Sequence, residues 1–235
     1  MGLSLNRSAV YIILSLLGLG LIGSALIGAA PGRNTSFAPL PLPSAGQKVA
    51  TFAGGCFWSM QKAFDGVPGV VATTAGYAGG TKANPGYEEV ETGRTGHAES
   101  VQLIYDPAKI SYKRLLDIYW HHIDPLTVNR AFCDRGPQYR SIIFYGDPEQ
   151  QKAAEESKRA LDQSHRFKTK IVTAIEPATK FYPAEEYHQQ FYKKNPGHYE
   201  AYRIGCGRDE RIRELWGDIS SRESGVGSQV AGAHQ

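Results

Sequence analysis

The chain has 235 residues, of which 41% are hydrophobic and 21% are charged. This composition suits a globular protein with a full core, and it excludes a wholly disordered, collagen-like or coiled-coil chain. The 26 basic and 23 acidic residues give a net charge of +3 and form no basic block, so charge does not favour nucleic-acid binding. The three cysteines include no C-x-x-C pair. They are too few for a disulfide scaffold or a structural zinc site, and they favour a redox or catalytic role.

The N-terminal region contains a long apolar run. Residues Ala9–Ala30 carry no charge over 22 positions, which is enough to cross a bilayer as a helix. This length favours an uncleaved anchor, whereas Gly28-Ala29-Ala30 offers small residues to a signal peptidase. We therefore expect residues 1–30 to be either a signal peptide or a membrane anchor, with residues 9–30 as the tether. The folded body should be exported or membrane-anchored, in the periplasm or another extracytoplasmic compartment.

Two further segments differ in composition from a packed domain. Residues 31–47 contain four of the 13 prolines, which predicts an extended linker. Residues 218–235 are rich in Ser and Gly and contain no aromatic residue, which predicts a disordered tail. The folded body is therefore expected to be a single domain over residues 48–217.

Within this body, apolar runs alternate with amphipathic segments. Strands are predicted at Lys48–Gly54, Val70–Ala75, Ser100–Asp106, Ser141–Tyr145 and Lys170–Glu176. Helices are predicted at Cys56–Phe64, Tyr112–His122, Pro148–Gln163 and Pro183–Lys194. This alternation favours α/β order, although the long loops argue against a regularly wound sheet.

The most specific local feature is a cysteine that follows two glycines. Gly54 and Gly55 end the first predicted strand in a tight turn and place Cys56 in the first turn of the next helix. Unpaired N–H groups and the helix dipole stabilise a thiolate at that position, and Phe57 and Trp58 give the sulfur an apolar wall. The alternative is an inert buried cysteine in a membrane-tethered binding module.

Two polar segments enter later strands. Glu99 begins an apolar strand, where desolvation would raise its pKa and make it a general acid; the alternative is a solvent-facing residue at a strand edge. His97-Ala98-Glu99 lacks the P-C-x-x-C partner of zinc deaminases, so a metal is not favoured. Asp134 is the first residue of the second polar segment, which is either a functional loop or a plain turn. Elsewhere, the turn before Tyr87 is expected to direct that side chain inward.

A second class of enzyme also fits these residues. Cys56 with His97 or His188 and a carboxylate would make a cysteine hydrolase or transferase, in which an imidazole activates the thiol and an acyl-enzyme forms.

Several short motifs, taken in order, resemble those of one family. They are Gly55-Cys56-Phe57-Trp58, Gly76-Tyr77-Ala78-Gly79-Gly80, Asn84-Pro85-Gly86-Tyr87, Thr95-Gly96-His97-Ala98-Glu99, Gln138-Tyr139-Arg140-Ser141, Tyr187-His188-Gln189 and Asn195-Pro196. Over Val49–Trp216 the chain resembles the A-type peptide methionine sulfoxide reductases.

This resemblance implies an α+β fold, a two-layer α/β sandwich around a ferredoxin-like plait with long coil segments. It also implies thiol-dependent reduction of methionine-S-sulfoxide, free and in proteins, which repairs proteins after oxidation. The implied site residues are the nucleophile Cys56, the proton donor Glu99, the hydroxyl donors Tyr87 and Tyr139, the orienting Asp134, and Phe57 and Trp58 as the seat of the substrate methyl group.

The family's cycle also implies a second sulfur. Attack by Cys56 leaves a sulfenic acid that another thiol converts to a disulfide, and a thioredoxin-like dithiol reduces it without a bound cofactor or metal. Cys206, flanked by glycines in a segment that we expect to be mobile, is the predicted resolving cysteine, with Cys133 as the alternative. The chain departs from many relatives at Phe191, where they have a tyrosine. We expect the enzyme to be a monomer.

Overall fold

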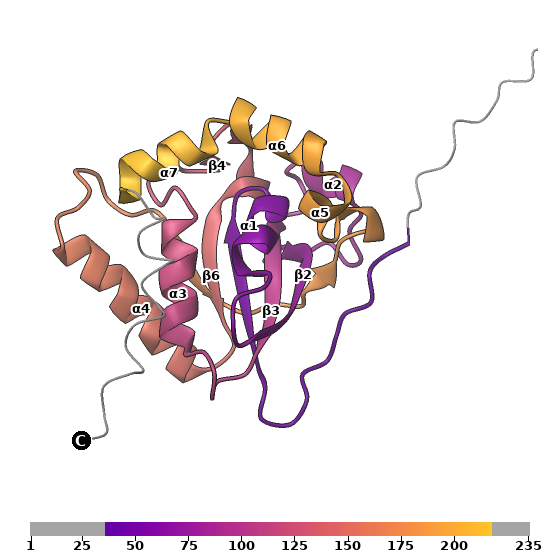
Figure 1. The fold of residues 1–235 in the computed structure, drawn as a ribbon, viewed down its shortest axis with the longest axis horizontal. Coiled ribbons are helices and arrows are strands. Elements are labelled where there is room, and N and C mark those ends of the chain that lie inside the picture. The colour runs from indigo at the N-terminus through magenta and orange to yellow at the C-terminus, as the bar shows by residue number, and fades with distance from the viewer. Residues whose placement is uncertain (1–35, 218–235) are drawn as a thin grey trace, which may run out of the picture. The chain divides into compact units, whose positions relative to one another are not determined.

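A six-stranded sheet lies at the centre of the computed structural model, which describes residues 36–217 (Figure 1). Its strands, in the order β7-β6-β1-β3-β2-β8, are Ala174–Pro177, Ser141–Tyr145, Lys48–Gly54, Ala98–Tyr105, Val70–Ala78 and Tyr182–Pro183. Only β6 and β7 are parallel. The β6-β1-β3-β2 order, with helices after β1 and β3, is that of a ferredoxin-like plait. The expected α+β fold is therefore confirmed.

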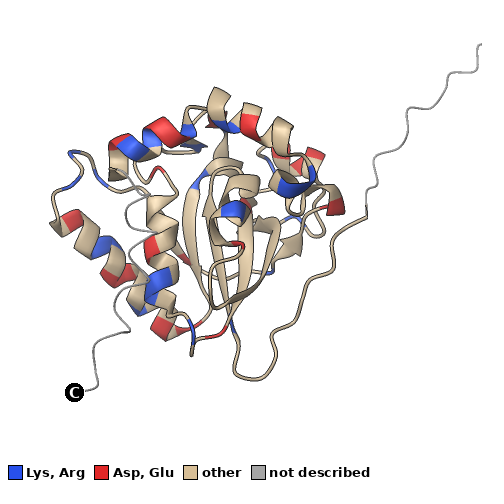
Figure 2. Ribbon diagram, viewed as in Figure 1, with Lys and Arg blue, Asp and Glu red and all other residues tan. Residues whose placement is uncertain are grey.

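Helices cover the sheet and its upper end (Figure 1). They are α1 (Phe57–Phe64), α2 (Tyr87–Glu91), α3 (Tyr112–His121), α4 (Pro148–Gln163), α5 (Phe191–Lys194), α6 (Pro196–Gly205) and α7 (Arg208–Trp216). α3 and α4 start at good caps, because the side chains of Ser111 and Asp147 accept backbone N–H groups of the first turn. Basic and acidic residues are interspersed along α4 and α7 (Figure 2).

The main core lies between the sheet and the helices α1 and α3. Phe52 of β1 is fully buried and stacks on Phe64 of α1 and Tyr119 of α3, with ring centroids 5.4 and 5.0 Å away. The Tyr119 hydroxyl donates to the carbonyl of Ala53 at 2.9 Å. This packing fixes the end of β1 against both helices, and it therefore fixes the turn that follows.

The last third of the body differs most from the sequence-based prediction. Residues 183–194 do not form one helix: Tyr182–Pro183 extends the sheet edge, Glu186–His188 is a 3-10 turn, and only Phe191–Lys194 is helical. Gln190 interrupts the helix with a φ of 49°, and its N–H donates to the side chain of Gln61. The strand predicted at Lys170–Glu176 begins later, at Ala174.

Two predicted segments lie outside the described residues: the apolar run Ala9–Ala30 and the tail 218–235. Among residues 36–217, no helix is both long and apolar enough to cross a membrane. Part of the predicted linker contacts the domain, since Ala38 donates to the carbonyl of Ala184 and Ser36 accepts from the N–H of Glu186. The linker therefore joins the domain at its sheet edge before β1 begins.

Candidate active site

The turn between β1 and α1 needs glycine for two reasons. Gly55 has a φ of +86°, a conformation that other residues avoid, and a Cβ there would lie 2.5 Å from the Cβ of Ala131. A Cβ on Gly54 would lie 2.4 Å from the side chain of Ile123. This turn places Cys56 at the N-cap of α1, where its carbonyl accepts from the N–H groups of Ser59 and Met60.

The Cys56 thiol is buried, with an exposed fraction of 6%. Burial raises its pKa far above the usual range, and the nearby carboxyl groups of Glu99 and Asp134 raise it further. Hydrogen bonds from the Tyr202 hydroxyl and the Trp58 N–H act in the opposite direction but do not prevail. The expected stabilised thiolate is therefore wrong for this structure, because desolvation exceeds the effect of the helix terminus.

Glu99 lies beside this thiol on β3. Its carboxyl group is 3% exposed and accepts the backbone N–H of Phe57 at 2.9 Å. Desolvation raises the pKa of Glu99 well above its ordinary value, and the Phe57 N–H opposes this only in part. The prediction of a buried carboxyl with a raised pKa at this position is confirmed.

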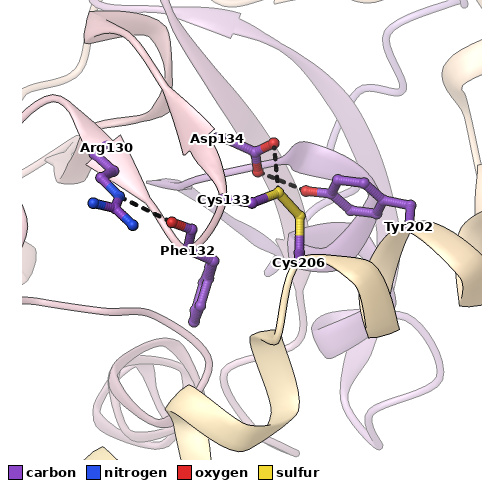
Figure 3. Close-up of a disulfide and its surroundings, with 6 residues drawn as sticks. All are labelled: Arg130, Phe132, Cys133, Asp134, Tyr202 and Cys206. Carbon is purple, nitrogen blue, oxygen red and sulfur yellow. Dashed lines mark hydrogen bonds between the residues drawn. A yellow bond between two sulfur atoms is a disulfide. The ribbon is translucent and has the colours of Figure 1, made fainter.

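Asp134 lies beside the other two cysteines and contacts Cys133 and the Tyr202 hydroxyl (Figure 3). It begins β5 (Asp134–Arg135), which pairs with β4 (Arg130–Ala131) in a short hairpin. The Tyr202 hydroxyl donates to Asp134 Oδ2 at 2.6 Å and also bonds to the thiol of Cys56. Burial raises the pKa of Asp134, although the Tyr202 hydroxyl lowers it. Tyr202, which the sequence analysis missed, therefore joins the acid to the thiol.

Cys133 and Cys206 form a disulfide, with Cα atoms 4.8 Å apart (Figure 3). Cys133 lies in the β4–β5 turn, and Cys206 ends α6 directly before the Gly207 corner that begins α7. Cys206 thus lies between two helices and in a disulfide, and the predicted mobility of its segment stays a prediction. Cys206 follows Tyr202 by one helical turn, and its N–H donates to the Tyr202 carbonyl.

Arg208 was also missed by the sequence analysis. Its side chain is 1% exposed, donates to the carbonyl of His122 at 2.8 Å, and has its guanidinium 4.2 Å from the ring centroid of Phe132. One of its terminal nitrogens, Nη1, has no hydrogen-bond partner and would lie 3.6 Å from a Cβ on Gly55. Its charge lowers the pKa of Asp134. A buried cation therefore lies directly under the cysteine turn.

The two predicted hydroxyl donors converge on a third side chain. Tyr139 donates to Glu91 Oε1 at 2.6 Å, and the Tyr87 hydroxyl bonds to the Glu91 carboxyl group as well. Desolvation and the neighbouring Glu99 raise the pKa of both tyrosines. Glu91 follows Tyr87 by four residues on α2, a spacing that places both on one helix face. That spacing was the available signal, and the sequence analysis did not use it.

Phe57 and Trp58 lie in different surroundings. Phe57 is buried, with its ring centroid 5.9 Å from Tyr77 and 4.9 Å from His188. Trp58 is half-buried, and its ring stacks on that of Phe191 with the centroids 3.8 Å apart. Phe191, which stands where many relatives have a tyrosine, therefore packs against the indole ring. The apolar wall therefore extends from the core to the rim beside Cys56.

The two histidines considered for the alternative hydrolase both form hydrogen bonds with groups other than the Cys56 thiol. His97 accepts from the N–H of Gly80 and bonds through its other ring nitrogen to the carbonyl of Lys82. His188 accepts from the Trp58 indole N–H at 3.0 Å. Neither arrangement is that of an imidazole that activates the Cys56 thiol. In residues 36–217, the one cluster of metal-ligand types is Cys133, Asp134 and Cys206, and its two sulfurs are joined.

A buried thiol, a buried carboxyl with a raised pKa beside it and a nearby disulfide define a thiol-dependent oxidoreductase. Comparison with known proteins agrees with this class. The family model for peptide methionine sulfoxide reductase matches residues 48–220. The peptide methionine sulfoxide reductase MsrA of Listeria monocytogenes serotype 4a is 52% identical over 167 residues, which cover 71% of this chain and 94% of that protein. The enzyme of the same name from Halalkalibacterium halodurans is 54% identical over 168 residues, or 72% and 96% of the two chains.

Two solved structures have a similar fold. Reduced Mxr1 from Saccharomyces cerevisiae matches with a TM-score of 0.63 and 33% identity over 67% of this chain and 90% of its own. Methionine sulfoxide reductase A of Corynebacterium diphtheriae matches with a TM-score of 0.58 and 30% identity, over 70% and 90%. The chain belongs to the peptide methionine sulfoxide reductase family. It is an oxidoreductase that reduces methionine sulfoxide by thiol chemistry.

The environment of Cys56 predicts slow alkylation. With the other two cysteines in a disulfide, Cys56 is the free thiol of the chain. Because only the thiolate reacts and the pKa is raised, its rate with iodoacetamide should grow about tenfold per pH unit from pH 7 to 9 without a plateau. Tyr202→Phe removes a hydrogen bond that lowers this pKa and should slow the reaction by about two- to tenfold.

Tyr192→Phe is the matched control, because the Tyr192 hydroxyl bonds to Asp65 instead. A rate plateau below pH 8 in the unmodified protein would contradict the raised pKa.

Proposed function

We propose that the residues around the turn act together on the sulfoxide. Cys56 is the nucleophile and Glu99 the proton donor, with Phe57 and Trp58 seating the methyl group. Tyr87 and Tyr139 donate to the sulfoxide oxygen, and Asp134 orients the network through Tyr202. The observation that carries the proposal is the buried Glu99 carboxyl group, which has a raised pKa and accepts the N–H of the residue that follows Cys56.

The chemistry requires protons to move as the sulfur–sulfur bond forms. The Cys56 sulfur attacks the sulfoxide sulfur while Glu99 protonates the oxygen, which becomes a leaving group. The oxygen is then transferred to Cys56, so that methionine leaves and Cys56 becomes a sulfenic acid. Two electrons pass from the cysteine sulfur to the substrate. Because the Cys56 pKa is raised in this structure, the thiol must also lose its proton during attack, and that proton replaces the one that Glu99 gives to the oxygen.

The substrate class follows from the family. We propose the S epimer of methionine sulfoxide, free or within proteins, and a role in the repair of proteins after oxidation. Support comes from the A-type motifs and from the peptide methionine sulfoxide reductase names of the relatives. The half-buried Trp58 at the rim is suited to a side chain that enters from a peptide.

Recycling requires a second thiol, and we propose Cys206. In its reduced form Cys206 attacks the sulfenic acid, so that a Cys56–Cys206 disulfide forms and water leaves. Cys133 then attacks Cys206 and frees Cys56, which produces the Cys133–Cys206 disulfide of this structure. Support comes from Tyr202, one turn before Cys206, which bonds to the Cys56 thiol. Cys133, exposed in its turn, presents the final disulfide to an external thioredoxin-like dithiol.

Replacement of Glu99 by Gln should separate proton donation from packing. The amide keeps the size of the side chain and an acceptor for the Phe57 N–H but supplies no acid, so turnover should fall by about 10²–10⁴-fold. Thermal unfolding of the variant should match that of the unmodified enzyme. Undiminished turnover across pH 6–8 would refute the role of Glu99.

Single-turnover reactions without reductant test the recycling order. Cys133→Ser should accumulate a Cys56–Cys206 disulfide and release one methionine per enzyme. Cys206→Ser should stop at the sulfenic acid, detected with a dimedone probe. A Cys56–Cys133 disulfide in Cys206→Ser, together with normal turnover on a thioredoxin-like reductant, would show that Cys133 resolves.

We also propose that the enzyme acts outside the cytoplasm, exported or held at the membrane through residues 9–30. The apolar run Ala9–Ala30 and the proline-rich segment after it support this location. An alkaline phosphatase fusion after Gly217 should be active, because this reporter requires an oxidising compartment. Deletion of residues 1–30 should abolish that activity. A fusion active only as a cytoplasmic reporter would refute export.

A further inference from the structure

Glu91 holds the two hydroxyls that the proposed function assigns to the sulfoxide oxygen. The Tyr139 hydroxyl lies 2.6 Å from Glu91 Oε1, and the Tyr87 hydroxyl bonds to the same carboxyl group. The charge of Glu91 also acts on both acids of the site, since it raises the pKa of Glu99 and of Asp134. A carboxylate oxygen therefore lies within the polar centre of the site.

The position of Glu91 makes this contact reversible. It is the last residue of α2, and its side chain is exposed to solvent at the rim. Among the ion pairs of residues 36–217, none includes Glu91. Its backbone is held separately, because the Gln138 amide donates to the Glu91 carbonyl at 3.0 Å. Rotation of the side chain alone releases both hydroxyls without movement of the helix.

A sulfoxide oxygen needs the same donors. Each tyrosine hydroxyl has one proton and can donate to one acceptor at a time. When Tyr87 and Tyr139 donate to Glu91, they do not donate to a substrate. Carboxylate and sulfoxide oxygens are both strong acceptors. A sulfoxide oxygen can therefore take the place of the Glu91 carboxylate without leaving either half-buried hydroxyl unpaired.

We propose that the Glu91 carboxylate is an internal competitor for the Tyr87 and Tyr139 hydroxyls, which a sulfoxide displaces when it binds. This inference rests on the proposed roles of the two tyrosines. It also assigns Glu91 a part in product release. The thioether of the product has no oxygen to accept from these hydroxyls, so the carboxylate returns to them once the sulfoxide oxygen has been transferred.

Binding without turnover tests this competition. In the Cys56→Ser background, calorimetry measures the Kd for the S epimer of N-acetylmethionine sulfoxide. Glu91→Ala removes the competitor and should lower the Kd by about five- to fiftyfold, the range expected for loss of hydrogen bonds to a charged acceptor. Glu91→Gln keeps a neutral acceptor, so its Kd should lie between those of the background protein and of Glu91→Ala. In the active enzyme, Glu91→Ala should lower the KM for the same substrate.

Glu88→Ala is the matched control. Glu88 is exposed on the same short helix, and its replacement by Ala changes the net charge by the same amount. The Kd of this variant should therefore equal that of the background protein. An equal gain in affinity from Glu88→Ala would show a general charge effect and overturn the inference, as would an unchanged or higher Kd in Glu91→Ala.

A tyrosine variant separates this inference from the proposed function. Tyr139→Phe should raise the Kd for the sulfoxide. If it does so while Glu91→Ala brings no gain, the tyrosine role stands and only the competition is wrong. If Tyr139→Phe leaves the Kd unchanged, the assigned role of the tyrosine fails, and the inference fails with it.

Discussion

The site depends on the burial of a thiol and a carboxyl group side by side. The N–H of Phe57 holds the Glu99 carboxyl group, and the preceding residue is the cysteine. Neither group can keep a negative charge in this desolvated space without cost, and the carboxyl group raises the pKa of the thiol further. Burial therefore favours the protonated form of both groups until an oxygen that can accept a proton arrives. The same burial that weakens Cys56 as a free nucleophile supplies the acid that sulfoxide reduction needs.

A short chain of contacts then links this pair to the disulfide. Tyr202 bonds to the Cys56 thiol and to Asp134, which is adjacent to Cys133. Cys206 lies one turn further along α6 and is bonded to Cys133 (Figure 3). Substrate chemistry and thiol recycling therefore share one tyrosine. The buried Arg208 at the start of α7 adds a positive charge beneath the turn, and it partly balances the carboxyl groups around Cys56.

The parts that were predictable from the sequence are those with a local cause. Strand β6 and helix α4 were predicted with the observed bounds, because an apolar run and a capped amphipathic helix carry their own signals. The glycine turn before Cys56 was predictable because two adjacent glycines after an apolar strand indicate a tight turn. The segment 183–194 was not, since its conformation is set by distant partners: the side chain of Gln61 binds the N–H of Gln190.

The same distinction applies to the site. The place of Glu99 at the start of an apolar strand left both a desolvated and a solvent-facing carboxyl open, and only the family resemblance favoured the first. The raised pKa of Cys56 depends on residues far along the chain. Tyr202 and Arg208 reach the site only because α6 and α7 cross the end of the sheet (Figure 1), which no local pattern reveals.

The central claim is that Glu99 stays protonated beside a protonated Cys56 near neutral pH. The most direct measurement is the carboxyl carbon shift of Glu99 in protein labelled with ¹³C at glutamate side chains, followed from pH 4 to 9, with Glu99→Gln to assign the resonance. We expect the shift of a neutral acid at pH 7, with titration only at higher pH. Titration near the ordinary glutamate pKa of about 4.3 would contradict the account.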